Sequence, residues 1–150
     1  MKMIEVCCAI ILDEEKMLAV QRGPESSHPW QWEFPGGKIR PGETAAQCIV
    51  REIEEELIVR IRVVARLEPV DFDYGIKQIC LIPFVCKIVS GEIRLTEHIA
   101  RRWVGFDQWK DIDWSGADRK LILKNQESLI YQVRENQSES NKYCGPAQDG

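Results

Sequence analysis

The apolar segment KQICLIPFVCKIV, residues 77–89, restricts the fold of this chain more than any other stretch. It is rich in β-branched residues, and its side chains are apolar at nearly every position instead of at every second one. A strand with this pattern is buried on both faces and lies at the centre of a sheet. The rest of the chain therefore has to supply neighbouring strands, and helices that cover the sheet.

The predicted neighbours begin with a hairpin near the N-terminus. The apolar segments EVCCAIIL and MLAVQR flank the polar turn DEEK between residues 5 and 22, which is the pattern of two strands joined by a turn. The segment that follows, GPESSHPWQ, carries two prolines and a glycine and predicts a loop. Further strands are predicted at residues 32–34, 59–70 and 101–106.

Two segments predict helices. Residues 44–57, TAAQCIVREIEEEL, have helical spacing of apolar residues, and Thr44 or Glu43 would be the N-cap. Residues 115–133 predict a second amphipathic helix. Two helices and a mixed sheet predict an α/β/α sandwich formed by residues 1–133. Residues 134–150 are polar and lack periodicity, so we expect a disordered C-terminal tail.

Composition narrows the class of protein. A chain of 150 residues with 44% hydrophobic residues is long enough for one domain with a full core. The net charge of -4 argues against a nucleic-acid polymer as partner, but not against a nucleotide, because a metal ion can neutralise its phosphates. No segment resembles a signal peptide or reaches the length of a membrane span, so we expect a cytoplasmic protein without a membrane partner. We expect buried free thiols, in preference to a zinc site or disulfides, at Cys7, Cys8, Cys48, Cys80 and Cys86.

The first predicted helix carries a concentration of carboxylates. Glu52, Glu55 and Glu56 are spaced i, i+3 and i+4, so their side chains share one face. Like charges at this spacing lower helix stability, but together they form an oxygen-rich site that suits Mg²⁺ or Mn²⁺. The alternative is a solvated acidic face, which is the interpretation we prefer for Glu54.

The residues around these carboxylates favour a ligand site. Gly36 and Gly37 allow the backbone to turn tightly and to approach a ligand closely. Arg51 can reach back to a loop carboxylate such as Glu43 and hold the loop against the helix through a bidentate pair.

The segment GGKIRPGETAAQCIVREIEEELIV, residues 36–59, resembles the Nudix box, G-x5-E-x7-R-E-U-x-E-E-x-G-U, where U is a bulky aliphatic residue. One position departs, because Ile58 stands where the pattern has its last glycine. That glycine ends the helix in a left-handed turn, so we expect a helix end of a different shape here. The positions that match are Gly37, Glu43, Arg51, Glu52, Ile53, Glu55, Glu56 and Val59.

The resemblance implies a Nudix fold with its loop–helix–loop, and a hydrolase of nucleoside diphosphates linked to a further group. It implies that Glu52, Glu55, Glu56 and the Gly36 carbonyl bind Mg²⁺, with Mn²⁺ as the alternative, and that Arg51 belongs to the catalytic residues. The later segment TEHIARRW matches a second family signature, which makes Glu97 a further metal ligand or the general base. Metal-assisted hydrolysis of this kind needs such a carboxylate cluster.

The segments MLAVQR and WEFPGGK resemble the MutT branch of the family, which cleaves nucleoside triphosphates to the monophosphate and pyrophosphate by attack at the β-phosphorus. This resemblance implies that Arg22 contacts phosphate and that Phe34 lines the base pocket, although Phe34 could be a core aromatic instead. Lys38, beside the glycine pair, is added to the substrate-binding candidates. We expect His98 to orient its loop.

Asp118 occupies the position where the resemblance places a contact to the base. The MutT branch has asparagine there, whereas the CTP pyrophosphohydrolase branch shares the AD pair of this chain. An ionised carboxylate accepts hydrogen bonds, so Asp118 would suit an exocyclic amine. The alternative is that Asp118 caps the helix that begins nearby.

Three enzymatic functions and one binding function are compatible with these residues. The first is a pyrophosphohydrolase of (deoxy)nucleoside triphosphates, oxidised or modified ones such as 8-oxo-dGTP included. A CTP or pyrimidine-type pyrophosphohydrolase and a hydrolase of ADP-ribose-like compounds are the alternatives. A nucleotide-sensing module is disfavoured because every acidic position of the box is kept. The partner in each case is a small nucleotide, and both a monomer and a homodimer stay open.

Overall fold

The structure is a computed structural model that describes residues 3–144. In the described part the sheet follows the order β3-β2-β1-β7-β5, with β4 paired to β1, β6 to β7 and β8 to β2. The strands are β1 (Met3–Asp13), β2 (Lys16–Gln21), β3 (Trp32–Glu33), β4 (Gly36–Lys38), β5 (Arg60–Arg66), β6 (Val70–Asp73), β7 (Gln78–Ser90) and β8 (Ala100–Gly105). The helices are α1 (Ala45–Leu57), the 3₁₀ helix η1 (Trp109–Asp111), α2 (Gly116–Lys124) and α3 (Gln126–Cys144).

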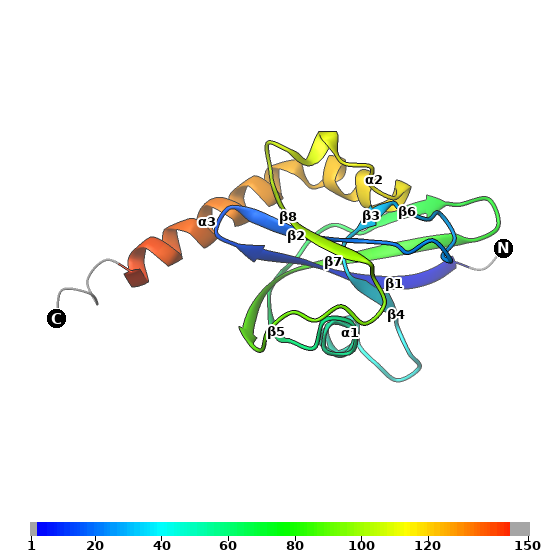
Figure 1. The fold of residues 1–150 in the computed structure, drawn as a ribbon, viewed down its shortest axis with the longest axis horizontal. Coiled ribbons are helices and arrows are strands. Elements are labelled where there is room, and N and C mark those ends of the chain that lie inside the picture. Colours follow the sequence, from blue (N-terminus) through cyan, green and yellow to red (C-terminus); the bar gives the residue numbers. More distant parts are fainter. Residues whose placement is uncertain (1–2, 145–150) are drawn as a thin grey trace.

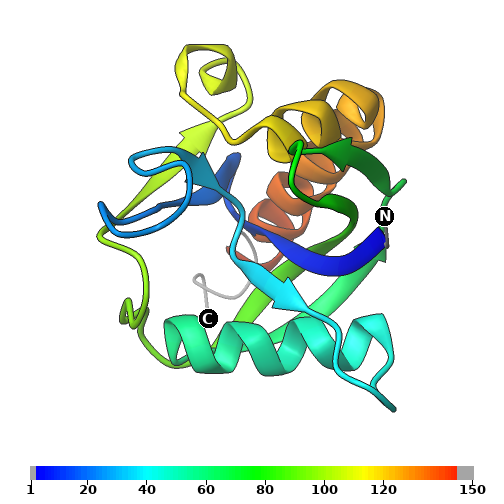
Figure 2. The ribbon, with the colours of Figure 1, turned by 90° about the vertical axis from the view of Figure 1, so that its right-hand side faces the viewer.

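The parallel pair β1 and β7 forms the centre of the sheet. Successive side chains of a strand point to opposite faces, so alternate residues of β1 enter two different cores. Cys7, Ala9 and Ile11 pack with α1, whereas Cys8 and Ile10 pack on the face that α2 and α3 cover. Figures 1 and 2 show α1 on one side of the sheet and α2 and α3 on the other. The predicted α/β/α sandwich with a mixed sheet is confirmed.

Helix α1 begins with a capping box. The Thr44 hydroxyl accepts a hydrogen bond from the Gln47 backbone N–H at 3.1 Å, and the Gln47 side chain accepts one from the Thr44 N–H at 2.9 Å. This reciprocal pair satisfies two of the amide groups that a helix start leaves open. Of the two candidate caps, Thr44 is therefore the N-cap.

The end of α1 contradicts our expectation that isoleucine would reshape it. Ile58 has φ 58° and ψ 35°, which is the left-handed conformation that glycine adopts at this position of the motif. Its backbone N–H donates to the Glu54 carbonyl, as in a left-handed C-cap. A β-branched side chain is strained in this conformation, so the surrounding chain has to impose it.

Two predicted elements are divided in the structure. The strand predicted at 59–70 is interrupted before Val70, where Pro69 lacks the N–H that a strand interior donates. The helix predicted at 115–133 breaks at Asn125, whose side chain donates to the Glu68 carbonyl and accepts from the Glu68 N–H, each at 3.0 Å. A buried amide that binds a neighbouring loop in this way competes with a continuous helix.

The C-terminal segment differs from the predicted tail. Helix α3 continues to Cys144, beyond residue 134 where we expected disorder to begin, and residues 145–150 lie outside the described part. Residues 134–144 contain no glycine or proline, and glutamate, glutamine, lysine and arginine are compatible with a helix. The buried Asn136 side chain also donates to the Glu14 carbonyl at 2.8 Å, which fastens the helix to the β1–β2 turn.

The cysteines of the described core follow the expectation of free thiols. Cys80 is partly exposed. The four buried cysteines are Cys7, Cys8, Cys48 and Cys86. None of these five cysteines forms a disulfide. None of the described helices is both long and apolar enough to cross a membrane.

We predict that Ile58→Gly raises the free energy of unfolding by up to about 1.5 kcal/mol. Relief of left-handed strain, about 1–2 kcal/mol, exceeds the cost of about 0.5–1 kcal/mol that glycine's flexibility adds through the unfolded chain. The Ile58 side chain is 48% exposed, so little packing is lost. Urea unfolding measures the change. Ile58→Ala is the control, because it truncates the side chain but keeps a Cβ; an equal gain in both variants would contradict the strain.

Candidate active site

The candidate site forms where the glycine pair passes between β1 and α1. In the β1–β4 ladder, Gly36 lies opposite Cys8 and Gly37 opposite Cys7. A Cβ at Gly36 would overlap the Cys7 carbonyl, and a Cβ at Gly37 would overlap the Glu52 carboxylate. Side chains at these two positions would push the loop away from the strand and the helix. The glycines therefore allow the backbone to lie directly against the acidic face of α1.

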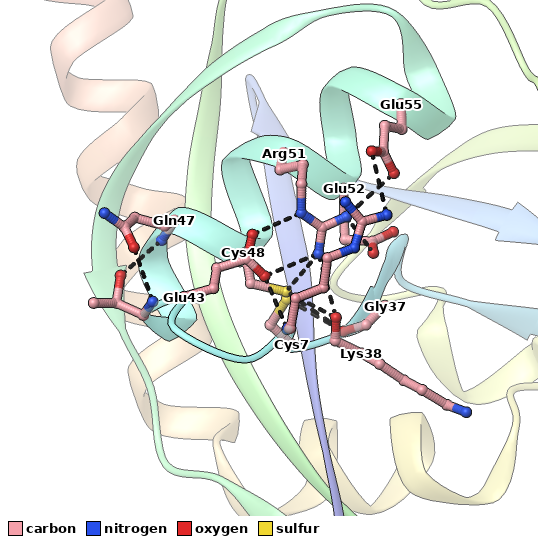
Figure 3. A network of polar contacts seen from close by, with 11 residues as sticks. Cys7, Gly37, Lys38, Glu43, Gln47, Cys48, Arg51, Glu52 and Glu55 are labelled. Atoms are coloured by element: carbon pink, nitrogen blue, oxygen red, sulfur yellow. Dashed lines mark hydrogen bonds and ion pairs between the residues drawn. The ribbon is translucent and has the colours of Figure 1, made fainter.

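Arg51 holds this loop and the helix together, as Figure 3 shows. Its Nε and Nη2 donate to the two carboxylate oxygens of Glu43 at 2.6 and 2.9 Å, which confirms the predicted bidentate pair. Its Nη1 donates to Glu52 at 2.9 Å and to Glu55 at 3.2 Å, and its Nη2 reaches the Lys38 carbonyl at 3.3 Å. The pair with Arg51 lowers the pKa of Glu43 to about 2 and raises the pKa of Arg51.

Glu56 differs from the other carboxylates of α1 because it is buried, with 3% of its surface exposed. Its Oε2 accepts a hydrogen bond from the Gly36 N–H at 3.1 Å. Burial raises its pKa to about 9, and the nearby charges of Glu97, Glu52 and Glu33 add to the rise. A solvated acidic face does not bury a carboxylate among other carboxylates, so the solvated interpretation does not fit Glu56. Glu54 and Glu55 are both exposed, and of these two only Glu55 contacts Arg51.

Glu97 reaches the same place from the segment between β7 and β8. This segment runs along the C-terminal end of α1 (Figure 2). The Arg94 N–H donates to the Leu57 carbonyl at 2.9 Å, and the Thr96 N–H donates to the Glu56 carbonyl at 3.1 Å. These bonds satisfy carbonyls that a helix end leaves open, and they place the next residue, Glu97, near the Glu56 carboxylate.

The donor set suits a divalent cation, although its side chains are not arranged as a coordination shell. Among the described residues, no group of three or more His, Cys, Asp or Glu is placed to hold a metal ion. Arg51 donates to both Glu52 and Glu55. The set contains only oxygen, which hard cations such as Mg²⁺ prefer. A cation beside Glu56 would also offset the repulsion that its buried carboxylate meets. The residues therefore fit a metal by the chemistry of their donor atoms.

A cavity of about 200 Å³ lies beside the acidic face, with Gly36 and Gly37 in its wall. Its lining combines apolar and aromatic residues with the cationic side chains of Arg22, Lys38 and Lys77. Its lining includes all four residues that the sequence predicted to bind substrate: Arg22, Phe34, Lys38 and Asp118. The combination of an apolar pocket and cations is the kind of site that takes a nucleotide.

Phe34 is both a core aromatic and a residue of the cavity wall, the two positions that the sequence left open. It is 3% exposed and packs on Trp114, with 4.9 Å between the ring centroids, so it belongs to the core. It also lines the cavity. A core aromatic of this kind presents a rigid wall to whatever enters the cavity.

Asp118 is not the N-cap that one interpretation proposed. Ser115 is the N-cap of α2, and Asp118 lies in the first turn. The Asp118 carboxylate accepts hydrogen bonds from the Phe34 N–H at 2.8 Å and from the Ser115 hydroxyl at 2.6 Å. Burial raises its pKa, and the charge of Glu33 raises it further. Each oxygen keeps a second lone pair, so a ligand in the cavity can still be a donor to Asp118.

Several residues of the cavity wall were not predicted from the sequence, and Glu33, Tyr74 and Lys77 are among them. Tyr74 and Lys77 lie on the turn between β6 and β7, which only the pairing of β7 with β1 brings to this place. Glu33 belongs to the segment WEFPGGK, and its position as a polar residue between two aromatic ones was a usable signal. Its carboxylate binds Arg22 at 3.2 Å and His98 at 2.9 Å.

Comparisons with known proteins agree with this geometry. The family profile described as NUDIX domain matches residues 1–124. The chain is 33% identical over 122 residues to the CTP pyrophosphohydrolase of Escherichia coli K12, covering 81% of this chain and 90% of that protein. It is 27% identical over 125 residues to the 8-oxo-dGTP diphosphatase of the same strain, covering 83% and 97%. The crystal structure of a MutT NUDIX hydrolase from Burkholderia pseudomallei superposes with a TM-score of 0.73 at 25% identity, covering 81% and 97%.

The Arg51–Glu43 pair predicts a pH-dependent contribution to stability. The pKa of Glu43 is lowered from 4.5 to about 2 in the folded protein, so its contribution is present above about pH 4.5 and lost as the pH falls towards 2. The difference in unfolding free energy between wild type and Glu43→Gln should therefore be constant near neutral pH and shrink on acidification. Urea unfolding across this pH range measures it. In the Arg51→Met background the same difference should vary much less with pH, because the hydrogen bond from the Arg40 N–H, at 3.0 Å, is then the largest remaining stabilisation of the ionised carboxylate. An undiminished pH dependence would show that Arg51 is not the main partner of Glu43.

Proposed function

This chain belongs to the NUDIX family of hydrolases, and from that premise we propose that it is a Mg²⁺-dependent pyrophosphohydrolase of (deoxy)nucleoside triphosphates. Its products would be the monophosphate and pyrophosphate. Oxidised or modified nucleotides such as 8-oxo-dGTP are the first candidate substrates. A CTP or pyrimidine nucleotide is the second candidate, and Mn²⁺ is the alternative metal.

One observation carries this proposal: the buried Glu56 carboxylate accepts a hydrogen bond from the N–H of Gly36, and Gly36 lines a cavity together with cationic and apolar residues. Burial of an ionised carboxylate among like charges is unfavourable unless a cation or donors compensate it. The Glu56 pKa of about 9 reflects this cost, and a bound cation would favour the ionised form again. The Gly36 N–H, which supplies one donor to Glu56, belongs to the same glycine pair that lines the cavity.

The proposed roles of the residues follow from their positions. Glu52, Glu55, Glu56, Glu97 and the Gly36 carbonyl would hold the metal, which when bound neutralises phosphate charge and lowers the pKa of a bound water. Arg51 keeps Glu52 and Glu55 and the loop of Glu43 in place.

The other roles concern substrate binding and proton transfer. Arg22 and Lys38 would bind phosphate oxygens, and Phe34 would form a wall of the base pocket. One carboxylate of the acidic face would accept the proton of the attacking water, since a base within hydrogen-bond reach is what this step needs.

The choice of base depends on Asp118 in this proposal. A carboxylate accepts from an exocyclic amine, which cytosine, adenine and guanine carry and uracil and thymine lack. The similarity to a CTP pyrophosphohydrolase favours a pyrimidine, and the similarity to an 8-oxo-dGTP diphosphatase favours a modified purine. Both substrates satisfy Asp118, so both belong in the first assay. ADP-ribose is included there as the remaining family alternative.

We also propose a cytoplasmic location and a small nucleotide as the partner. The five described cysteines of the core are free thiols, which a reducing compartment preserves. The formal net charge of -4 does not suit a nucleic-acid polymer.

The experiment is a screen of triphosphates, 8-oxo-dGTP and CTP derivatives among them, with pyrophosphate release as the readout. Reaction in ¹⁸O-water should place the label in pyrophosphate, as the MutT resemblance implies attack at the β-phosphorus. Label in the monophosphate would mean attack at the α-phosphorus, and release of orthophosphate alone would refute the assignment. Glu56→Gln is the control: it keeps the shape and removes the charge, so turnover should fall by orders of magnitude.

For Asp118, we predict that Asp118→Asn changes the preference between bases and leaves the metal-dependent chemistry in place. Asparagine can still accept from Phe34 and donate to Ser115, so the fold should persist. A mismatched buried contact to the base costs about 1–3 kcal/mol, or roughly 5–150-fold in relative kcat/KM. The measurement is kcat/KM across bases for both proteins, with thermal unfolding as the stability control. Unchanged ratios would restrict Asp118 to the role of holding Phe34 and Ser115.

A further inference from the structure

His98, Glu33 and Arg22 form a chain of polar contacts across three segments. Glu33 on β3 accepts from Arg22, at the end of β2, with 3.2 Å between Nε and Oε1. Its other oxygen, Oε2, lies 2.9 Å from Nε2 of His98, on the segment before β8. The His98 side chain is only 6% exposed, whereas Glu33 and Arg22 are each 23% exposed. The chain of contacts thus runs from a buried imidazole to a guanidinium in the cavity wall.

The hydrogen-bonding capacity of these groups determines the direction of the contacts. An ionised carboxylate only accepts hydrogen bonds, so Nε2 of His98 has to carry the proton that it shares with Glu33. The other ring nitrogen, Nδ1, is buried and has no hydrogen-bond partner among the described residues. The imidazole is therefore oriented by packing and by one polar contact, and that contact is Glu33.

We propose that His98 is a positioning residue, an inference that rests on the proposed function. His98 holds the Glu33 carboxylate in one orientation, and Glu33 in turn holds Arg22 where it can bind the substrate phosphates. A long arginine side chain loses much rotamer freedom when it is held in one geometry. Glu33 occupies Nε of Arg22 and leaves the terminal nitrogens available for phosphate. Without a donor on the far side, the Glu33 carboxylate would be free to rotate, and Arg22 would lose its fixed partner.

The position of Glu33 gives this contact a second consequence. The Glu33 charge acts on Asp118, which lines the same cavity, and the Glu33 carboxylate also contacts Arg22. Glu33 is therefore near both the proposed base contact and the proposed phosphate contact. A mobile Glu33 would bring negative charge closer to either end. Both effects weaken substrate binding. The Glu33 charge also acts on Glu56, but among the described residues neither Glu33 nor His98 forms a hydrogen bond or ion pair with the carboxylates of α1. The inference therefore predicts a change in KM rather than in kcat.

The first test compares His98→Leu with His98→Gln on the triphosphate that the wild-type enzyme prefers. Leucine removes the donor, and we expect KM to rise about tenfold, equivalent to about 1.4 kcal/mol, with kcat within about twofold of wild type. Glutamine offers an amide N–H near the position of Nε2 and should restore most of the wild-type KM. If glutamine is as defective as leucine in a folded protein, packing is the role of His98. If kcat falls and KM does not, His98 acts on the metal face.

A double-mutant cycle tests whether the effect passes through Arg22. In the Arg22→Ala background, His98→Leu should change KM little further, because the residue that it positions is absent. Additive effects of the two changes would overturn the proposal. Glu33→Gln is an independent variant for the case that His98→Leu does not fold: its amide nitrogen opposes a donor, so KM should rise in the same way. Ile99→Ala, on the same segment and 47% exposed in wild type, is the matched control and should leave KM unchanged.

A readout without catalysis separates this inference from the proposed function. The chain has two histidines, so ¹⁵N NMR of the imidazole rings, with His28→Gln for assignment, reports the His98 tautomer. We expect a protonated Nε2 and a bare Nδ1 in wild type, and a changed ring signal in Glu33→Gln. A proton on Nδ1 alone would overturn the proposal. If the wild type cleaved no triphosphate, the proposed function would fail, while the ring signals would still test the contact between His98 and Glu33.

Discussion

The parallel pairing of β1 with β7 is the constraint on which the rest of the structure depends. Because both strands are buried on both faces, alternate residues of β1 anchor two separate cores, and each core needs its own helical layer. The same strand then pairs with β4, where Gly36 and Gly37 leave room for the Glu52 carboxylate and the Cys7 backbone. The packing of the sheet therefore determines where the glycine pair lies, and the glycine pair determines how close the acidic face of α1 comes to the cavity. The position of the site therefore follows from the packing of the core.

The electrostatics of α1 are divided between two kinds of carboxylate. Glu43, Glu52 and Glu55 share the guanidinium of Arg51, whose planar set of donors can serve several oxygens at once. Glu56 receives one backbone N–H and is surrounded by the charges of other carboxylates. Arg51 thus compensates the like charges that would otherwise destabilise the helix, and Glu56 is left as the position with an unmet need for positive charge. This division explains why a helix with four closely spaced glutamates can be stable and still prepared for a cation.

The sequence predicted those parts that depend on local spacing. Spacing within a short segment predicted the central strand, the Arg51–Glu43 pair and the shared helical face of Glu52, Glu55 and Glu56. A short motif led to Arg22 and Phe34, which line the cavity. It failed where distant contacts decide. The break at Asn125 depends on Glu68, the continuation of α3 is accompanied by a contact with Glu14, and the link between His98 and Glu33 joins segments 65 positions apart. No local pattern reports such contacts, because the partner is chosen by the topology of the sheet.

Ile58 shows how a local rule can be overridden. Isoleucine disfavours the left-handed conformation, yet the conformation is kept because the chain on both sides requires it. On one side the turn directs the chain from α1 into β5; on the other it ends the helix so that the carbonyls of Glu56 and Leu57 accept from the segment that carries Glu97 and His98. A helix that continued past Ile58 would use those carbonyls itself and displace this segment. The strain at Ile58 therefore accompanies the arrangement that brings Glu97 to Glu56 and His98 to Glu33, which connects the end of one helix to both the metal face and the substrate cavity.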